Sequence, residues 1–408
     1  MTLPLSNLKQ KKTILFYSTH KSWGGSEKYW YEMILHPAFA AQFKPVVMLH
    51  EDPALRARAD AILKLGGEVI WYHTYLFWLE QIALKILKSF KRFNFKAQFL
   101  QREHWQFPWL KPLKTTDADL VWFNISGANA LTSASLSHAT QICEKKGLPY
   151  WLIFQHMRED FLPDQLEKLT HMIEGAQRVI FIARRNQMVV ERCLGGKLPN
   201  AVLSQNAIQH SFIVDAAAKS AANPVSTTGK VRLLLLGQLV PGHKGQHILF
   251  EVLTSEKWRQ RDWELTLLGG GNKERIERLI RYFNFPVDRL HMPGFSTDVI
   301  TQIIGYDLLI MPSLSEGTPF AMVECMACGR PAVGTPVGGI PELIGEGKTG
   351  WLARSTQVED VDAALEKAWG ERHLWPAYGQ NAQQMIAQKY DQDKTIASLI
   401  QWLGEDCR

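Results

Sequence analysis

Short, uninterrupted apolar segments alternate with helical patterns along most of this chain, and this alternation restricts the fold more than any other feature. Buried parallel strands read as continuous apolar runs, and a crossover helix usually joins two of them. The sequence therefore predicts doubly wound α/β domains with helices on both faces of parallel sheets. The predicted strands are 13–18, 45–50, 68–72, 119–123, 150–155, 179–182 and 201–203 in the first half, and 231–236, 263–268, 290–292, 308–311 and 332–333 in the second.

The length of the chain and one change in composition suggest how it divides. A chain of 408 residues is longer than one hydrophobic core usually supports, so two domains are expected. Residues 210–229 are rich in Ala, Ser and Thr and carry little core pattern, so we interpret them as a linker. We expect an N-terminal domain over 1–209, a C-terminal domain over 230–390, and a final helix over 391–408 that packs back on the first domain.

Charge and cysteine content limit the partners and the compartment. The net charge of +6 favours anionic ligands or an anionic membrane surface but is too small to indicate nucleic acid. We expect neither a membrane-spanning helix nor a signal peptide, because no long apolar stretch is present. Five scattered cysteines suit a reducing cytoplasm, and Cys325 and Cys328, which lie inside a predicted helix, are expected to pack rather than bind a metal.

The most informative stretch is 308–331, LLIMPSLSEGTPFAMVECMACGRP. It reads as a buried strand, then a loop broken by Pro312 and Gly317, then a helix that begins near Pro319. A loop at the carboxyl end of a parallel strand that opens into a helix presents backbone amides to a phosphate. The sequence therefore predicts a phosphate-bearing ligand at this position.

Two carboxylates bracket this predicted site. Glu316 lies in the loop and Glu324 in the helix, and eight helical residues at about 1.5 Å each separate them by roughly 12 Å. A retaining glycosidase holds its two carboxyl groups only about 5 Å apart, so these two do not form a hydrolytic pair. Their spacing fits the two ends of a nucleotide sugar. The alternative is that one is a solvated loop residue and the other a surface helix residue.

Glycine-rich loops follow other predicted strands, at the sheet edge where ligands of such folds bind. Gly24 and Gly25 precede a helix in the first half, and the corresponding loops of the second half are 237–245, 269–271 and 338–342. Lys244, in the first of these, would place a point charge beside a diphosphate. Tight turns and a solvated lysine are the simpler interpretation of each motif alone, but together the loops predict one interdomain cleft.

Taken together, these motifs resemble family 4 of the retaining glycosyltransferases, whose GT-B fold has two Rossmann-like domains facing each other across a cleft. The motifs that carry the resemblance are Gly24-Gly25-Ser26-Glu27, Gly237 through Lys244-Gly245, Glu316-x7-Glu324 with Ala327-Cys328-Gly329, and Gly338-Gly339-Ile340-Pro341-Glu342. The resemblance covers most of 230–355 and implies metal-independent transfer of a hexose from a nucleotide sugar, foremost a UDP-hexose. The acceptor would be a saccharide or lipid-linked saccharide held by the N-terminal domain, as in bacterial polysaccharide or glycolipid synthesis.

The resemblance also implies roles for individual residues. Glu324 would bind the ribose hydroxyls, Glu316 would lie against the donor sugar and Lys244 would contact the diphosphate. His156 matches a family histidine near the donor sugar, the alternative being a strand-end histidine without a function. The catalytic candidates are thus Glu316, His156 and Lys244. The donor-binding candidates are Gly24, Gly25, Gln238, Lys244, Gly270, Glu316, Thr318, Phe320, Ala321 and Glu324.

One position departs from the family pattern. The family usually carries an arginine directly after the glycine that ends the first strand of the second domain, and here that residue is Gln238. A neutral amide donates hydrogen bonds but does not offset the charge of a departing diphosphate, so Lys244, with a neighbour such as His243, would carry more of that work. The departure keeps open a second interpretation, a nucleotide-sugar-binding protein with weak or no transfer activity.

Residues 75–114 form an insert rich in lysine, arginine and aromatic residues, in which part of the sequence has the pattern of a basic amphipathic helix. Such a helix can lie in a membrane interface or contact an anionic lipid carrier, which predicts peripheral contact with the inner face of a membrane. An ordinary helix with a solvated basic face fits the pattern equally well. Nucleic acid is not expected, because its recognition needs a denser basic track with exposed stacking aromatics.

Overall fold

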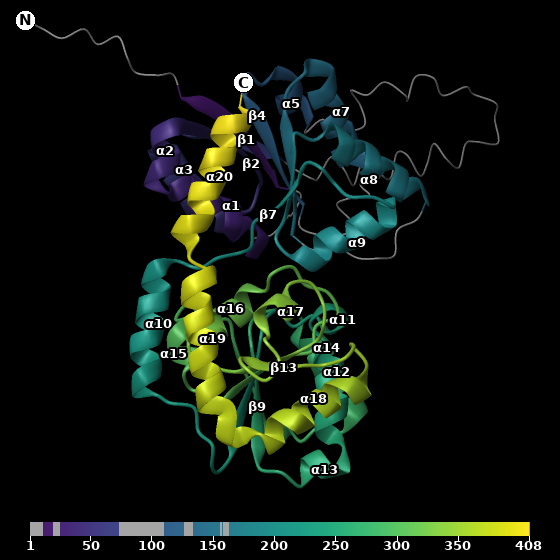
Figure 1. Ribbon diagram of the computed structural model, residues 1–408, viewed down its shortest axis with the longest axis vertical. Coiled ribbons are helices and arrows are strands. Elements are labelled where there is room, and N and C mark those ends of the chain that lie inside the picture. The colour runs from purple at the N-terminus through teal and green to yellow at the C-terminus, as the bar shows by residue number, and fades with distance from the viewer. Residues whose placement is uncertain are drawn as a thin grey trace, which may run out of the picture.

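The computed structural model describes residues 11–18, 25–72, 110–125, 134–155, 157 and 163–407. These residues form a seven-stranded sheet with the order β3-β2-β1-β4-β5-β6-β7 and a six-stranded sheet with the order β10-β9-β8-β11-β12-β13. Figure 1 shows the two sheets with their helices as two domains, one above the other along the long axis. The predicted pair of doubly wound parallel-sheet domains is therefore confirmed.

The first domain alternates strands and helices as its sequence predicts. Its strands are β1 (Lys12–Ser18), β2 (Phe43–His50), β3 (Glu68–Tyr72), β4 (Leu120–Ile125), β5 (Tyr150–Phe154), β6 (Arg178–Phe181) and β7 (Ala201–Leu203). Its described helices are α1 (Gly25–Leu35), α2 (Pro37–Gln42), α3 (Arg56–Lys64), α5 (Lys111–Thr115), α7 (Ala134–Lys146), α8 (Pro163–Gly175) and α9 (Arg184–Leu194). All pairings within this sheet are parallel, so the carboxyl ends of its strands share one edge.

The second domain repeats this arrangement. Its strands are β8 (Val231–Leu236), β9 (Trp263–Leu268), β10 (Leu290–Gly294), β11 (Leu308–Met311), β12 (Ala332–Gly334) and β13 (Gly350–Leu352). Its helices are α10 (His210–Ala222), α11 (Pro241–Lys244), α12 (Gln246–Thr254), α13 (Glu256–Arg259), α14 (Lys273–Phe283), α15 (Val299–Ile303), α16 (Phe320–Ala327), α17 (Ile340–Leu343), α18 (Val358–Gly370) and α19 (Trp375–Lys389). Strand β13 was not predicted, because it begins at a glycine and follows Gly345 and Gly347, so the stretch reads as a turn.

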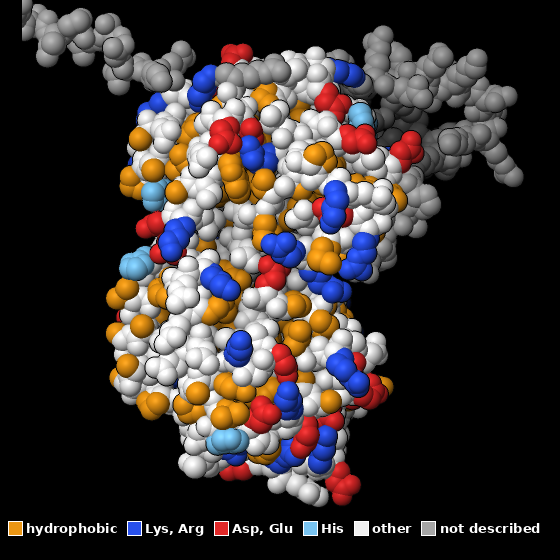
Figure 2. All heavy atoms as spheres, in the orientation of Figure 1, with side chains coloured by type: hydrophobic (Ala, Val, Ile, Leu, Met, Phe, Trp, Pro, Cys, Tyr) orange, Lys and Arg blue, Asp and Glu red, His pale blue; other side chains and the backbone are white. Residues whose placement is uncertain are grey.

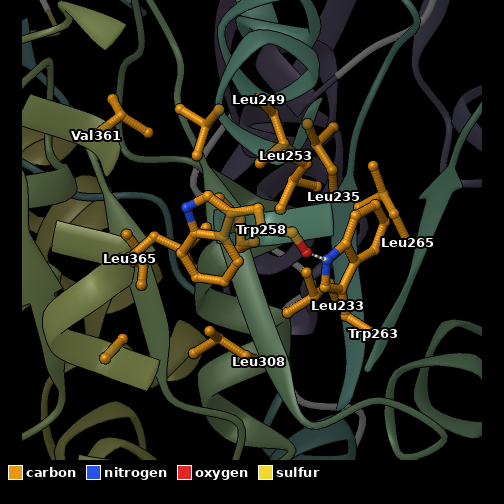
Figure 3. Packing of buried hydrophobic residues seen from close by; sticks show 14 of the residues in the cluster. Leu233, Leu235, Leu249, Leu253, Trp258, Trp263, Leu265, Leu308, Val361 and Leu365 are labelled. Carbon is orange, nitrogen blue, oxygen red and sulfur yellow. Dashed lines mark hydrogen bonds between the residues drawn. The ribbon is translucent and has the colours of Figure 1, made fainter. Parts of the chain in front are cut away.

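Tryptophan side chains fill much of both cores. Trp30, Trp122 and Trp151 are buried against the first sheet. In the second domain, Trp258 packs among leucines of β8, β9, β11 and α12, and Trp263 donates a 2.7 Å hydrogen bond to the Trp258 carbonyl (Figure 3). Each buried indole removes a large apolar area from water, so these rings stabilise the layers that carry the loops of interest.

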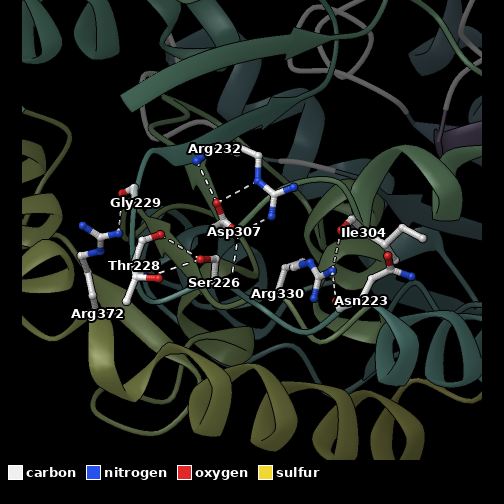
Figure 4. A network of polar contacts seen from close by, with 9 residues as sticks. All are labelled: Asn223, Ser226, Thr228, Gly229, Arg232, Ile304, Asp307, Arg330 and Arg372. Atoms are coloured by element: carbon white, nitrogen blue, oxygen red, sulfur yellow. Dashed lines mark hydrogen bonds and ion pairs between the residues drawn. The ribbon is translucent and has the colours of Figure 1, made fainter. Parts of the chain in front are cut away.

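The segment 210–229, interpreted as a linker from its composition, is helical over most of its length. Helix α10 occupies His210–Ala222, and its Ile213 and Ala216 are buried in the core of the second domain. The following residues are also fixed, because the Ser226 amide and the Arg232 guanidinium both donate to the buried Asp307 carboxylate (Figure 4). The sequence did not predict this helix, because alanine and serine give little hydrophobic periodicity.

The C-terminal helix α20 (Gln392–Asp406) returns from the second domain and lies along the first (Figure 1). Its apolar side chains Ile396, Leu399, Ile400 and Leu403 belong to the core beneath the first sheet. At its last turn, Asp406 accepts hydrogen bonds from Arg178 at 2.7 Å and from the Trp151 indole at 2.8 Å. The last turn is thus held to the first domain by a largely buried ion pair.

Removing that ion pair should destabilise the first domain. We expect Asp406→Ala to lower the free energy of unfolding by roughly 3 kcal/mol, because Arg178 would keep its charge in a largely buried position without its main partner. The matched control is Glu405→Ala. It removes a half-exposed carboxylate that lies 3.2 Å from the same guanidinium. The control should change stability by less than about 1 kcal/mol. Urea unfolding followed by tryptophan fluorescence would compare the two variants, and equal losses would contradict the assignment.

Two predictions concern membranes. The basic insert at 75–114 lies outside the described residues except for its last part, where α5 begins. Within the described part of the chain, no helix combines the length and the apolar character needed to cross a bilayer. On the face shown in Figure 2, lysine and arginine side chains with some acidic ones lie along the junction of the two domains, and the lower end of the second domain also mixes both signs of charge.

Candidate active site

Glu316 lies in the loop between β11 and α16 and is almost fully buried, with 6% of its surface exposed. Its carboxylate accepts hydrogen bonds from Lys244 Nζ at 2.6 Å and from Ser313 Oγ at 2.8 Å. Burial raises the pKa of Glu316, but the charges of Lys244 and His243 and these two hydrogen bonds outweigh burial and hold the pKa below its ordinary value. The loop therefore presents an ionised carboxylate beside a lysine.

Lys244 reaches Glu316 because the loops after β8 and β11 are pressed together. Gly245 has a positive φ of 69°, and a Cβ atom there would lie only 1.9 Å from the Pro312 carbonyl oxygen. The Leu314 amide also donates to the His243 carbonyl at 2.8 Å. Only glycine allows this approach, which brings the end of α11 against the Glu316 loop.

The Glu316 loop also contacts the first domain. The hydroxyl of Thr318 donates to the Ile182 carbonyl, and the Thr318 carbonyl accepts from Asn206 Nδ2 at 2.8 Å. A Cβ atom at Gly317 would lie 1.9 Å from the Gln155 carbonyl oxygen. The predicted donor residue Thr318 therefore uses its side chain at the domain contact, and the loop is closed against the carboxyl ends of β5 and β6.

Helix α16 carries the second predicted carboxylate. Met322 and Val323 both donate to the Pro319 carbonyl, so Phe320 and Ala321 supply the amides that a helix start leaves without a partner inside the helix. Glu324 lies one turn after Phe320 and is largely buried. Burial raises its pKa above the ordinary value, and Lys28 opposes that rise. The helix start and this carboxylate lie one turn apart on the same face, as an extended nucleotide ligand requires.

The loops after β8 and β9 lie side by side, since the Leu239 amide donates to the Gly270 carbonyl at 2.8 Å. Gly269 has a φ of 151°, and a Cβ atom there would meet the Gly237 carbonyl oxygen at 2.1 Å, whereas a Cβ atom at Gly270 would meet no described heavy atom within 4 Å. Gln238 is exposed, and its backbone carbonyl accepts from Gln246. The middle glycine is thus the open position of this pair of loops.

The Gly-Gly-Ile-Pro-Glu motif, residues 338–342, packs against the backbone of the loop that carries Glu316. A Cβ atom at Gly338 would lie 2.1 Å from the Glu316 carbonyl oxygen, and the Gly339 amide donates to the Gly317 carbonyl at 2.7 Å. Glycine at these positions therefore fixes the backbone of the loop that carries Glu316.

Glu342, the last residue of that motif, joins the two domains. Its carboxylate accepts from the Arg184 amide at 2.7 Å and from Gln205 Nε2 at 2.5 Å. Arg184 is the first residue of α9, so Glu342 places a negative group at the positive end of a helix in the other domain. The motif therefore fixes the relative position of the domains around the Glu316 loop.

The structure brings together most of the predicted site residues that it describes. Glu316 and Lys244 are in direct contact, and a Cβ atom at Gly25 would lie 3.0 Å from the Phe320 ring. Gly24 and His156 lie outside the described residues. Ser313 was not predicted, although it lies in the same loop.

Possible metal ligands and the two thiols of α16 bear on the chemistry of the site. In the ranges that the structure describes, no three His, Cys, Asp or Glu side chains are grouped so that they could hold a metal ion. Cys325 and Cys328 are buried free thiols, and burial raises the pKa of Cys328 to about 12. A thiol with so high a pKa is unreactive, which agrees with the predicted packing role.

Comparison with known proteins finds sequence similarity over the second domain. Residues 230–370 match the family model described as glycosyl transferases group 1. WcaL of Salmonella typhimurium, assigned to colanic acid biosynthesis as a glycosyltransferase, is 32% identical over 171 residues, which are 39% of this chain and 42% of that protein. N-acetyl-alpha-D-glucosaminyl L-malate synthase of Bacillus anthracis is 33% identical over 140 residues, 32% of this chain and 36% of that protein. The chain thus spans less than half the length of these curated relatives.

Solved structures resemble the whole chain in fold. HepE of Anabaena, crystallised with UDP-glucose, has a TM-score of 0.68 at 18% identity and covers 96% of this chain and 99% of its own. Sucrose-phosphate synthase of Thermosynechococcus elongatus has a TM-score of 0.68 at 15% identity, covering 97% of this chain and 99% of its own. These similarities confirm the GT-B fold, with two Rossmann-like domains.

Proposed function

We propose that the chain is a retaining glycosyltransferase of family 4 that transfers a hexose from a UDP-linked sugar to a saccharide or lipid-linked saccharide in polysaccharide or glycolipid synthesis. The observation that carries the proposal is the buried Lys244–Glu316 pair, at the carboxyl edge of the second sheet and next to the first domain. The group 1 match of 230–370 supports transfer, and the UDP-glucose complex of HepE supports a UDP-linked donor.

The donor would lie along α16. Its diphosphate meets the amides of Phe320 and Ala321 at the helix start, and its ribose hydroxyls donate to Glu324. Lys244 has three N–H donors, so it can keep its contact with Glu316 and also hold a diphosphate oxygen. Gly25 approaches this helix from the first domain, with Gly24 before it in the chain.

Charge separation in the transition state explains this set of residues. As the anomeric bond stretches, negative charge develops on the diphosphate, where Lys244, Gln238 and the α16 amides stabilise it. Positive charge develops on the sugar, next to the ionised Glu316. The acceptor hydroxyl attacks from the face that the diphosphate leaves and passes its proton to the departing oxygen, which retains the configuration. Since Lys244 and the helix start supply the positive charge, we propose that no metal or other cofactor takes part.

A second candidate function is nucleotide-sugar binding with weak or no transfer. It is favoured by Gln238, which is exposed and uncharged at the position where the family usually has arginine. This candidate predicts that the donor binds but is neither transferred nor hydrolysed. Measuring UDP release from bound UDP-glucose, with and without saccharide acceptors, distinguishes the two functions.

We also propose contact with an anionic membrane and a lipid-linked acceptor. Both rest on the basic pattern of 75–114 alone. Cosedimentation with liposomes that contain or lack anionic lipid would examine that part independently of the donor site.

Nucleotide affinity provides the direct test of the donor site. We expect calorimetric titration to show micromolar binding of UDP in preference to GDP and ADP. Glu324→Ala should weaken it about 10- to 100-fold, because two hydroxyl hydrogen bonds to a charged group are lost. The control is Glu256→Ala, which removes an exposed carboxylate from α13. This variant should bind UDP as the wild type does. Unchanged affinity in Glu324→Ala would reject the ribose assignment, and a wild type that binds none of the three would reject the proposed donor.

A further inference from the structure

Helix α1 of the first domain meets α16 of the second at the candidate ribose carboxylate. Gly25, Lys28 and Glu32 share one face of α1, and Phe320 and Glu324 share one face of α16. Lys28 Nζ lies 3.6 Å from Glu324 Oε1, 3.8 Å from Glu32 Oε1 and 4.9 Å from the centroid of the Phe320 ring. We call these five residues the α1–α16 contact.

The short distance between the helices depends on Gly25. A Cβ atom at this position would lie 3.0 Å from Phe320 Cδ2, tighter than an ordinary van der Waals contact. Because Lys28 follows one turn later, the same approach carries its ammonium group over the aromatic ring, where a cation is attracted by the π electrons. Lys28 is therefore held at the boundary between the domains.

We propose that Lys28 is a positioning residue for the donor, which reaches across from the first domain and keeps Glu324 in the ionised form that accepts the two ribose hydroxyls. The inference rests on the proposed function, since it takes Glu324 as the ribose ligand. Through Lys28 the first domain would also help to recognise the nucleoside. The motifs of the second domain alone do not indicate this role.

The balance of charge in the α1–α16 contact supports this role. Burial raises the pKa of Glu324 above its ordinary value, and Lys28 is the cation that opposes this rise. Burial also raises the pKa of Glu32, and the charge of Glu324 raises it further. Without Lys28, two neighbouring carboxylates would lack their compensating charge, and protons would bind them more readily. A protonated carboxyl group has lost acceptor capacity, so it holds two hydroxyls less well.

The other described groups around Glu324 do not replace Lys28. Gln392, at the start of α20, donates to Glu32 and is neutral. On α16 itself, Cys325 and Cys328 are buried thiols with raised pKa values, so they are uncharged near neutral pH. Lys28 is the cation that the described contacts place at this carboxylate.

The test is the pH dependence of donor affinity. Calorimetry with UDP-glucose, whose diphosphate does not titrate near neutral pH, would be run from about pH 6 to about pH 8.5 on the wild type and on Lys28→Gln, Lys28→Arg and Lys44→Gln. Lys28→Gln raises the pKa of Glu324, so its affinity should be about tenfold weaker at the acid end and recover as Glu324 ionises with rising pH. Lys28→Arg keeps the charge and should restore the wild-type profile. Lys44→Gln removes an exposed lysine of β2 and serves as the control.

The possible outcomes separate the two levels of inference. A Lys28→Gln variant that binds as the wild type does, or is weakened equally at every pH, overturns the role of Lys28 while the donor site stands. A wild type that binds no UDP-glucose overturns the proposed donor and this inference with it. The melting temperature of each variant shows whether the fold is kept.

Discussion

Glu316→Gln is expected to reduce turnover by about 10²- to 10³-fold, comparable to the loss of one group that stabilises transition-state charge. The substitution keeps the size of the side chain and its hydrogen bond from Ser313, but it removes the negative charge beside Lys244. The charge that develops on the donor sugar would then lack its nearest anion. Nucleotide binding should change by less than about threefold, because the diphosphate and ribose contacts lie on other residues.

This prediction can be checked before the acceptor is known. UDP release from UDP-glucose in water reports the breaking of the anomeric bond, and saccharide acceptors can then be added. Glu256→Gln is the matched control, since it makes the same change on an exposed residue of α13. A Glu316→Gln enzyme with the wild-type rate would remove Glu316 from catalysis. A fall in nucleotide affinity equal to the fall in turnover would instead indicate a binding role.

The fold could be predicted because most of its strands are short apolar runs that stand out in the sequence. The run 308–311 is continuously apolar and 231–236 is apolar except for Arg232, and the observed β11 and β8 have the same bounds. Helix α10 and strand β13 were missed, because the helix is built largely from small residues and the strand begins at a glycine in a glycine-rich stretch. Sequence patterns therefore identified elements with long apolar or amphipathic runs and missed two whose residues are mainly small or flanked by glycine, although Trp351 of β13 is fully buried.

Sequence motifs predicted most of the candidate site in the second domain, and Gly25 in the first. Glu316 and Lys244 were both identified, and they meet because β8 and β11 are neighbours whose carboxyl ends share an edge. Lys28 was not identified, because its position depends on which face α1 turns toward α16 and on how closely the domains approach. Such contacts follow from glycine positions and domain packing, which no local pattern of residues encodes.

Gly317→Ala should abolish most of the transfer activity while leaving nucleotide binding largely intact at about pH 8.5, where Glu324 is expected to ionise without help from Lys28. The added Cβ atom would lie 1.9 Å from the Gln155 carbonyl oxygen and 2.4 Å from Ile182 Cδ1, so the Glu316 loop and the first domain would have to separate. Separation would break the hydrogen bond from Thr318 to the Ile182 carbonyl. A displacement of about 1 Å between reacting groups can cost about 10²-fold in rate, and we expect a loss at least that large.

The control for this prediction is Gly370→Ala, because a Cβ atom there would meet no described heavy atom within 4 Å. Both variants would be compared in UDP affinity and in the rate of UDP release from UDP-glucose. Gly317→Ala acts on the first domain's approach alone, whereas Glu324→Ala acts on the nucleotide, so the first should lower the rate and the second the affinity. Wild-type turnover in Gly317→Ala would show that the contact between the Glu316 loop and β5 is not needed for catalysis. Loss of rate with retained affinity would mean that the contact between the Glu316 loop and the first domain matters more for transfer than for binding the nucleotide.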